Sequence, residues 1–312
     1  MIVIYGPTAS GKTDFAEELA KHIPSEIINM DMGQCYTPLT IGTAKPDWRN
    51  SSIPQHGFDI INEPVNYTVV QYRSFVQKTI EEVKKRGNMP ILVGGSGFYL
   101  KSLLYEPTMA PKVVAQQKPM YPQDQFERWQ LLNAIDPDRA AQIHPHDSYR
   151  VTRALDIWYE SGIKPSLCAP LFNPIDSFLI ITVTRDRYDL YARINQRTKI
   201  MVEQGWIEEV QALLNTPWEP FLLEKKIIGY DDIITFLKDH QSKDNLIDTI
   251  QKKTRNYAKR QLIFAAGLER EIRKSLLGSS CKSDWLTLNL TSQSFELYIK
   301  QVLNHPYLMK ST

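Results

Sequence analysis

Residues 1–13 of the chain have the sequence MIVIYGPTASGKT. They begin with a short apolar run of β-branched and aromatic side chains, which predicts a buried β-strand. The residues that follow match the pattern GxxxxGK(S/T) at every fixed position. In this pattern the glycines let the backbone point its N–H groups inward, the lysine adds a mobile cation, and the final hydroxyl can bind Mg²⁺. We therefore predict a phosphate-binding loop made of Gly6, Pro7, Thr8, Ala9, Ser10, Gly11, Lys12 and Thr13.

A carboxylate is expected beside this loop. Apolar residues at helical spacing predict an amphipathic helix from Thr13 to Pro24, which would bring its positive end to the loop. A second strand at residues 26–30 ends at Asp31. In a parallel α/β sheet, ligands bind at the carboxyl ends of the strands. The sequence therefore predicts that Asp31 and the phosphate loop lie at the same edge of one sheet.

The remaining patterns predict an α/β fold: a P-loop NTPase-like, doubly wound parallel sheet flanked by helices. Further strands are expected at residues 58–61, 90–93 and 178–183, with an amphipathic helix from about 69 to 85. Helices are then expected at residues 186–204, 206–215, 226–238 and 246–277.

The predicted domain organisation has three parts. Residues 1–104 and 174–278 form the catalytic core with its C-terminal helices, and residues 105–173 form a small helical insertion domain. Proline-rich segments at residues 107–122 and 165–174 bound the insertion, and its helix near residue 148 has Asp147 or Ser148 as its N-cap. Residues 279–312 are a tail of unknown role with a possible edge strand at 285–290.

The composition limits the classes of protein to which the chain can belong. A hydrophobic content of 42% and a charged content of 23% are ordinary for a globular chain of 312 residues. No apolar run approaches the roughly 20 residues that span a bilayer, and the first strand leaves no room for a signal peptide. We therefore expect a cytosolic protein without membrane contact.

Three widely spaced cysteines predict free thiols. Basic residues dominate residues 252–274, which suggests a polyanion-binding helix.

Several longer motifs follow one another along the chain. They are DMGQ at 31–34 with Tyr36, IGTAKP at 41–46, GGSGFYL at 94–100, HPHDSYRVTRALD at 144–156, RINQR at 193–197, VEQGWIEEV at 202–210, IGY at 228–230 and TRNYAKRQ at 254–261. Together with GPTASGKT, this set resembles the tRNA dimethylallyltransferases (isopentenyl transferases). That family attaches a five-carbon prenyl group to N6 of the adenosine beside the anticodon, at position 37 of tRNA. The chain departs from the family pattern at Met32, Ser96, Asp231, Asp232 and residues 262–266.

The resemblance implies roles for the residues of the phosphate loop and of the strand ends. The loop would hold the diphosphate of dimethylallyl diphosphate, while Lys12 and a Mg²⁺ ion on Thr13 stabilise charge as the C–O bond breaks. Arg193 or Arg197 would clamp the same oxygens, unless they are simply exposed helix arginines. Asp31 would be the general base, although a Mg²⁺ ligand or a helix N-cap is an alternative reading.

The resemblance also implies an RNA surface. The target adenosine must be extruded from the anticodon loop, where Gln34 can pair with its edge and Ser96 can bind the substrate or pyrophosphate. Lys45 is a plausible second phosphate contact. Lys259, Arg260 and Gln261 are expected to grip the RNA backbone. The expected contacts with the tRNA anticodon stem-loop are Asp31, Met32, Gly33, Gln34, Ser96, Tyr149, Arg150, Val151, Thr152, Arg153, Gly229, Tyr230, Lys259, Arg260 and Gln261.

Three alternatives stay open at this point. An adenylate isopentenyltransferase would prenylate free AMP, ADP or ATP by the same chemistry, but it would not need so long a cationic helix. A P-loop small-molecule kinase would need only the first motif. A non-catalytic RNA-binding relative would account for the departures near Met32 and residue 262, but not for the presence of Asp31, Lys12 and Thr13. By resemblance, we expect a monomer.

Overall fold

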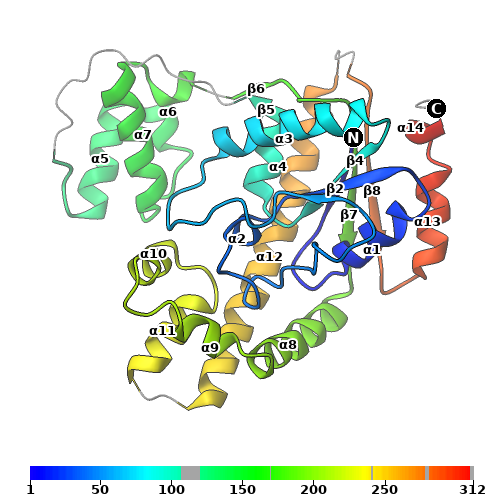
Figure 1. Cartoon of the computed structure of the whole chain (residues 1–312). Coiled ribbons are helices and arrows are strands. Elements are labelled where there is room, and N and C mark those ends of the chain that lie inside the picture. The colour runs from blue at the N-terminus through cyan, green and yellow to red at the C-terminus, as the bar shows by residue number, and fades with distance from the viewer. Residues whose placement is uncertain (107–119, 169, 240–241, 278–280, 310–312) are drawn as a thin grey trace. The chain divides into compact units, whose positions relative to one another are not determined.

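The computed structural model describes residues 1–106, 120–168, 170–239, 242–277 and 281–309. It divides into two compact units (Figure 1): Met1–Leu103 with Ile175–Thr312, and Leu104–Pro174. Most of the first proline-rich segment that we expected at the boundary, residues 107–119, lies outside the described residues. Among the residues that are described, none of the helices combines the length and the apolar character that crossing a bilayer requires.

Within its described residues, the first unit is built on a six-stranded sheet, and all neighbouring strands are parallel. Across the sheet the strands are β3 (Gln55–His56), β2 (Ser25–Asn29), β4 (Met89–Gly94), β1 (Ile2–Tyr5), β7 (Phe178–Thr184) and β8 (Ser283–Asn289). β1 lies in the middle, with Ile2 opposite Ile91 of β4 and Leu179 of β7. The α/β class and the parallel sheet are therefore confirmed.

The strand predicted at residues 58–61 is wrong. The strand beside β2 is instead β3, whose Gln55 and His56 pair with Ile27 and Ile28. Downstream, Gly57 has a φ of 84° and Asp59 a φ of 52°, and both values interrupt an extended backbone. Ile61 therefore makes only an isolated bridge to Tyr36.

Helices cover both faces of the sheet. Because strand side chains alternate between faces, Ile2 and Ile4 of β1 pack with Phe15 and Leu19 of α1 on one face, while the Tyr5 hydroxyl donates to a carbonyl of α12 on the other. The helices of this part are α1 (Lys12–Ala20), α2 (Met32–Cys35), α3 (Val69–Lys85), α4 (Gly97–Leu104) and α12 (Lys243–Ser275). The first core of the unit thus lies between the sheet and α1.

A second core in the same unit gathers helices that follow β7. They are α8 (Arg187–Glu203), α9 (Trp206–Gln211), α10 (Trp218–Lys225) and α11 (Tyr230–Asp239), which pack beside α12 (Figure 1). The helix predicted at residues 226–238 exists as α11, but it begins only at Tyr230, because Lys226 has a φ of 50° and ends α10. The sequence patterns did not predict α10, because Pro217 and Pro220 suggest a loop. Both prolines lie at the start of the helix, where proline is tolerated.

The tail is part of the sheet. β8 pairs with β7 along its whole length, from Ser283 opposite Phe178 to Asn289 opposite Thr184, so the predicted edge strand exists. Two helices that the sequence did not reveal follow it: α13 (Phe295–Leu303) and α14 (Pro306–Met309). α13 packs against α1, where Phe295 meets Phe15 edge to face.

The second unit has its own small core. Its elements are β5 (Tyr105–Glu106), α5 (Gln125–Ile135), α6 (Pro137–Ala140), α7 (Ser148–Ser161), the 3₁₀ helix η1 (Pro165–Leu167) and β6 (Leu171–Phe172), which pairs antiparallel with β5. Leu132, Val151 and Leu155 are buried between α5 and α7. Asp147 is the N-cap of α7 as predicted, and its side chain accepts from the Arg150 N–H at 3.1 Å.

Candidate active site

The loop between β1 and α1 has the closed shape that its motif predicts. Ala9 and Gly11 adopt left-handed φ values of 62° and 90°, and the Ser10 N–H donates to the Pro7 carbonyl at 3.2 Å. A Cβ atom on Gly6 would lie 2.5 Å from the Val183 carbonyl oxygen, so only glycine lets the loop pass this close to β7. The loop thus closes directly before the N-terminus of α1, a position that stabilises an anion.

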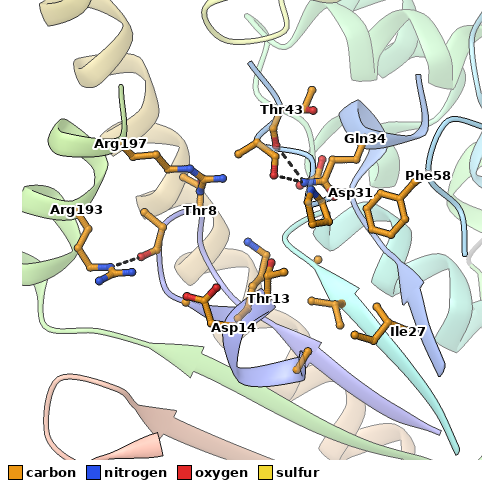
Figure 2. A pocket seen from close by; sticks show the side chains of 18 of the residues that line it. Thr8, Thr13, Asp14, Ile27, Asp31, Gln34, Thr43, Phe58, Arg193 and Arg197 are labelled. Atoms are coloured by element: carbon orange, nitrogen blue, oxygen red, sulfur yellow. Dashed lines mark hydrogen bonds between the residues drawn. The ribbon is translucent and has the colours of Figure 1, made fainter. Parts of the chain in front are cut away.

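Two arginines of α8 contact this loop. Arg193 donates from Nε to the Ala9 carbonyl at 3.0 Å, and Arg197 donates from Nη1 to the Thr8 hydroxyl at 3.3 Å (Figure 2). Both side chains line the same cavity as Lys12. A guanidinium group has five N–H donors, so each arginine keeps further donors for an anion in the loop.

Sequence reasoning missed Arg185, a third arginine at the loop. It donates from Nε to the Ser10 carbonyl at 2.8 Å and from Nη1 to Asp189 at 2.7 Å. The Asp189 carboxylate also accepts from Thr291, which follows β8 in the tail. Arg185 directly follows β7, so the strand-end rule that selected Asp31 would also have selected it.

Asp31 stands at the end of β2, as predicted, and it is also an N-cap. Its Oδ1 accepts from the N–H of Gly33 at 3.2 Å, which caps α2. Asn29 fixes its backbone, because the Asp31 N–H donates to Asn29 Oδ1 at 2.8 Å and Asn29 Nδ2 donates back to the Asp31 carbonyl. Next to it, the Ser96 hydroxyl accepts from the Met32 N–H at 3.3 Å. One carboxylate oxygen of Asp31 is thus used for capping, and the residue still lines the cavity.

Lys12 and Asp31 face one cavity of about 710 Å³. Figure 2 shows the labelled residues of its wall, with Thr13 and Asp14 at the start of α1 and Asp31, Gln34 and Thr43 across from the loop. A second cavity of about 320 Å³ adjoins it. The walls that both cavities share are Thr8, Ala9, Asp31, Thr43, Ala44 and Arg197.

The second cavity has a different chemical character. Apolar side chains such as Met201, Trp206 and Ile228 line it together with the hydroxyl-bearing Ser96 and with four basic residues, Arg197, Lys225, Lys226 and Arg260. Such walls suit a partly apolar group that carries polar or negatively charged atoms. Because Asp31 belongs to both cavities, a group in one can meet a group in the other at this carboxylate.

The two cavities meet at Asp31, and we call this place the junction. Burial shifts the protonation equilibria of the charged groups there. Burial lowers the pKa of Lys12 to about 8, although the neighbouring Asp31 carboxylate acts in the opposite direction. Burial raises the pKa of Asp31, against Lys12, the Gly33 N–H and Arg197, which all favour its charged form. The pKa of Arg197 is also lowered by burial. A carboxylate with a raised pKa beside a cationic loop is suited to accept a proton.

Some residues that we expected to touch RNA are occupied inside the protein. Gln261 is only 4% exposed, and its amide binds Thr8 and Gly95, so it does not grip an RNA backbone. Tyr230 is fully buried, and its hydroxyl donates to Glu209 at 2.7 Å. A Cβ atom on Gly229 would lie 2.1 Å from the Trp206 ring, so Gly229 is a packing position.

Two further expectations fail for similar reasons. Lys45 donates to the carbonyls of Tyr36 and Thr37 and pairs with Asp59, and its side chain is 3% exposed, so it is not a phosphate contact. Val151 is fully buried in the core of the second unit. On the same helix, Thr152 accepts from Arg128 at 3.2 Å, while Tyr149, Arg150 and Arg153 are exposed. At the two departures Asp231 and Asp232, both carboxylates pair with Lys253.

Comparisons with known proteins agree on one family. The family model described as IPP transferase matches residues 34–267. A tRNA dimethylallyltransferase of Thermotoga neapolitana is 35% identical over 277 residues, covering 87% of this chain and 91% of the relative. One from Petrotoga mobilis is 33% identical and covers 97% of this chain and 98% of its own.

Solved structures give the same answer. A eukaryotic dimethylallyltransferase acting on tRNA is similar with a TM-score of 0.80 and 25% identity, covering all of this chain and 79% of the other. A tRNA delta(2)-isopentenylpyrophosphate transferase from Staphylococcus epidermidis is similar with a TM-score of 0.61 and 27% identity, covering 96% of both chains.

Proposed function

Because the chain belongs to the IPP transferase family, we propose that it transfers a dimethylallyl group from dimethylallyl diphosphate to N6 of the adenosine adjacent to the anticodon of tRNA. The observation that carries this proposal is the junction at Asp31. A cationic phosphate loop and a half-buried carboxylate with a raised pKa line one cavity, and a second, partly apolar cavity opens onto the same carboxylate.

The diphosphate occupies the first cavity. Its oxygens lie against the N–H groups of the loop and the N-terminus of α1, where Lys12, Arg193 and Arg197 supply positive charge. As the bond between C1 of the dimethylallyl group and the bridging oxygen breaks, the electron pair goes to the diphosphate. These cations stabilise the charge that develops on the leaving group.

The adenosine base enters the second cavity, and its N6 amine reaches the junction. N6 attacks C1 of the dimethylallyl group, the new N–C bond replaces the C–O bond, and Asp31 takes the proton that N6 loses. Ser96 and Met32, which are joined by a hydrogen bond, form the neighbouring wall. The products are prenylated RNA and pyrophosphate, so all atoms and charges are accounted for.

A Mg²⁺ ion fits the start of α1. Thr13 and Asp14 line the first cavity beside Lys12, and oxygen ligands of this kind suit Mg²⁺, which usually takes few protein ligands and completes its shell with phosphate oxygens and water. Thr13 would hold the ion, which would neutralise diphosphate charge. In the described part of the chain there is no cluster of three or more His, Cys, Asp or Glu residues able to hold a metal.

Two exposed basic surfaces are proposed to bind the anticodon stem-loop. Lys259 and Arg260 are exposed on α12, and Arg260 also lines the second cavity. In the second unit, Arg150 and Arg153 are exposed on α7 together with Tyr149, whose ring can stack on an unpaired base. We propose that the protein works as a monomer in the cytosol, where its RNA substrate is found.

The deciding experiment is mass spectrometry of nucleosides after incubation of the protein with dimethylallyl diphosphate, Mg²⁺ and an anticodon stem-loop. AMP is offered in a parallel reaction. A prenyl mass gain on the RNA adenosine that is lost in Asp31→Ala supports the proposal. Gain on AMP alone would assign the adenylate activity instead, and no gain in either reaction would refute prenyl transfer.

A further inference from the structure

The carboxylate of Glu209, on α9, binds a loop that walls both cavities. Its Oε2 accepts from the N–H groups of Thr40 at 3.0 Å and Ile41 at 2.7 Å. Its Oε1 accepts from the N–H of Gly42 at 3.2 Å and from the hydroxyl of Tyr230 at 2.7 Å. One side chain thus satisfies four donors, and three of them are consecutive backbone groups of this loop, which we call the 40–44 loop.

The 40–44 loop also fits tightly against a ring. A Cβ atom on Gly42 would lie 2.0 Å from Nε1 of Trp206, so only glycine allows the backbone to pack there. Trp206 and Tyr230 are themselves buried and meet edge to face. Glu209 therefore anchors the loop to a rigid group of buried aromatic side chains.

The same loop fixes the side-chain amide of Gln34. Gln34 Nε2 donates to the carbonyls of Thr43 at 3.1 Å and Ala44 at 3.2 Å, as the dashed lines in Figure 2 show. The turn is closed by the Ala44 N–H, which donates to the Ile41 carbonyl at 2.9 Å. Because both N–H groups of the amide are used, Gln34 offers a ligand its Oε1, which can only accept.

We propose that Glu209 is a positioning residue for the acceptor base. It holds the 40–44 loop in place and, through this loop, the side-chain amide of Gln34. This inference rests on the proposed function. The exocyclic amine of adenine has two hydrogens. Gln34 lines the first cavity and Asp31 lines both cavities, so an amine that reaches the place where the cavities meet would donate one hydrogen to Gln34 Oε1 and the other to Asp31. Two acceptors side by side would select an amine over a carbonyl and would aim the N6 lone pair at the prenyl donor.

The test compares Glu209→Ala and Glu209→Gln with Glu208→Gln, a control that changes an exposed carboxylate on the same helix. We expect Glu209→Ala to lower kcat about 10- to 100-fold, since misplacement by about 1 Å can have effects of this size. Glu209→Gln keeps one acceptor oxygen and should recover part of the loss. The KM for dimethylallyl diphosphate should stay within about twofold, because the phosphate loop makes none of these contacts.

A double-mutant cycle separates positioning from general stabilisation. If Glu209 acts through Gln34, the kcat of the double variant Glu209→Ala/Gln34→Ala should be only slightly lower than the kcat of Gln34→Ala alone. Additive losses would overturn the inference, and so would unchanged kcat in Glu209→Ala. Binding of inorganic pyrophosphate reports whether each variant is folded, and its loss in both Glu209 variants would mean a purely structural role. An inactive wild-type protein would refute the proposed function itself, which keeps the two failures distinct.

Discussion

Gln261, in the middle of α12, accepts a hydrogen bond from the backbone N–H of Thr8 through its Oε1 at 3.0 Å. Its Nε2 donates to the Gly95 carbonyl at 2.8 Å, and its own carbonyl accepts from the Tyr5 hydroxyl at 3.1 Å. One buried residue therefore joins the phosphate loop, the glycine-rich turn after β4 and the long basic helix. Its neighbours Lys259 and Arg260 are exposed on that helix, so the proposed RNA surface is rigidly connected to the phosphate loop.

Replacing Gln261 by leucine should weaken the phosphate loop. The Thr8 N–H and the Gly95 carbonyl would lose their partner, and leaving such groups unpaired costs about 1–3 kcal/mol of unfolding free energy. We expect a lower unfolding temperature together with a higher KM for dimethylallyl diphosphate. Lys259→Ala, two residues away and exposed, should leave that KM unchanged. An unaltered KM in Gln261→Leu would contradict the connection.

Lys12→Met should remove positive charge at the point where the leaving group gains negative charge. Loss of one preorganised stabilising group commonly costs about 10²–10³ in kcat. Single-turnover rates with saturating RNA and donor would measure this loss. Retention of more than half of the wild-type rate would show that Lys12 does not act on the leaving group.

The binding of pyrophosphate should depend on pH through Lys12. In the free protein its pKa is lowered to about 8, so the cation is lost as the pH rises through this value and binding should weaken there. Asp31 raises the pKa of Lys12, so in Asp31→Asn the weakening should begin at a lower pH. Calorimetric titration between pH 6 and 10 would test both statements. Identical profiles in the two proteins would contradict the coupling.

Prenyl transfer should need Asp31 in its deprotonated form. Because burial raises its pKa, kcat/KM should rise with pH through a value above that of an ordinary aspartate, and should fall again as Lys12 loses its proton. Asp31→Asn keeps an oxygen that can cap α2, and it should lower kcat about 10²–10⁴-fold as expected for loss of a general base. A normal melting temperature in this variant would separate catalysis from helix capping.

We expect Arg185 to hold the phosphate loop in place, with help from Thr291 of the tail. Arg185→Ala removes the donor to the Ser10 carbonyl and frees Asp189, which Thr291 also binds. We expect KM for dimethylallyl diphosphate to rise several-fold, whereas the exposed Arg187→Ala serves as a matched control with little effect. Thr291→Val should show a smaller change in the same direction. Equal kinetics in all variants would show that the tail does not support the loop.

RNA binding should respond to salt through the exposed cations. Each phosphate contact contributes a slope of about −0.7 to log K against log salt for single strands. Lys259→Ala and Arg260→Ala should each weaken RNA binding and reduce the slope by about that amount. The control is Lys300→Ala, on α13, which lies in an exposed pair with Glu296. Fluorescence anisotropy of a labelled stem-loop over a range of salt concentrations gives both quantities.

Local patterns predicted most of the framework correctly. The apolar run before GPTASGKT, the strand that ends at Asp31 and the helix at Val69–Lys85 depend on contacts between near neighbours in the chain, such as the capping box between Thr68 and Gln71. The local patterns failed at residues 58–61, where Asp59 has a left-handed backbone conformation and interrupts an apolar run that resembles a strand. Conformations at single residues of this kind leave little trace in hydrophobic periodicity.

By itself, the sequence determined the phosphate loop, the parallel α/β class and the placement of Asp31 at a strand end, because motif spacing and periodicity are properties of short segments. Only the tertiary structure decided which polar side chains remain free for a ligand. Gln261, Tyr230 and Lys45 look like surface or ligand residues in the sequence, yet each has its hydrogen-bonding groups occupied inside the protein. Conversely, Glu209 and Arg185 gain their roles from partners about 170 residues away in the chain. A buried polar group must find a partner wherever the fold brings one near, and that pairing is not encoded in local spacing.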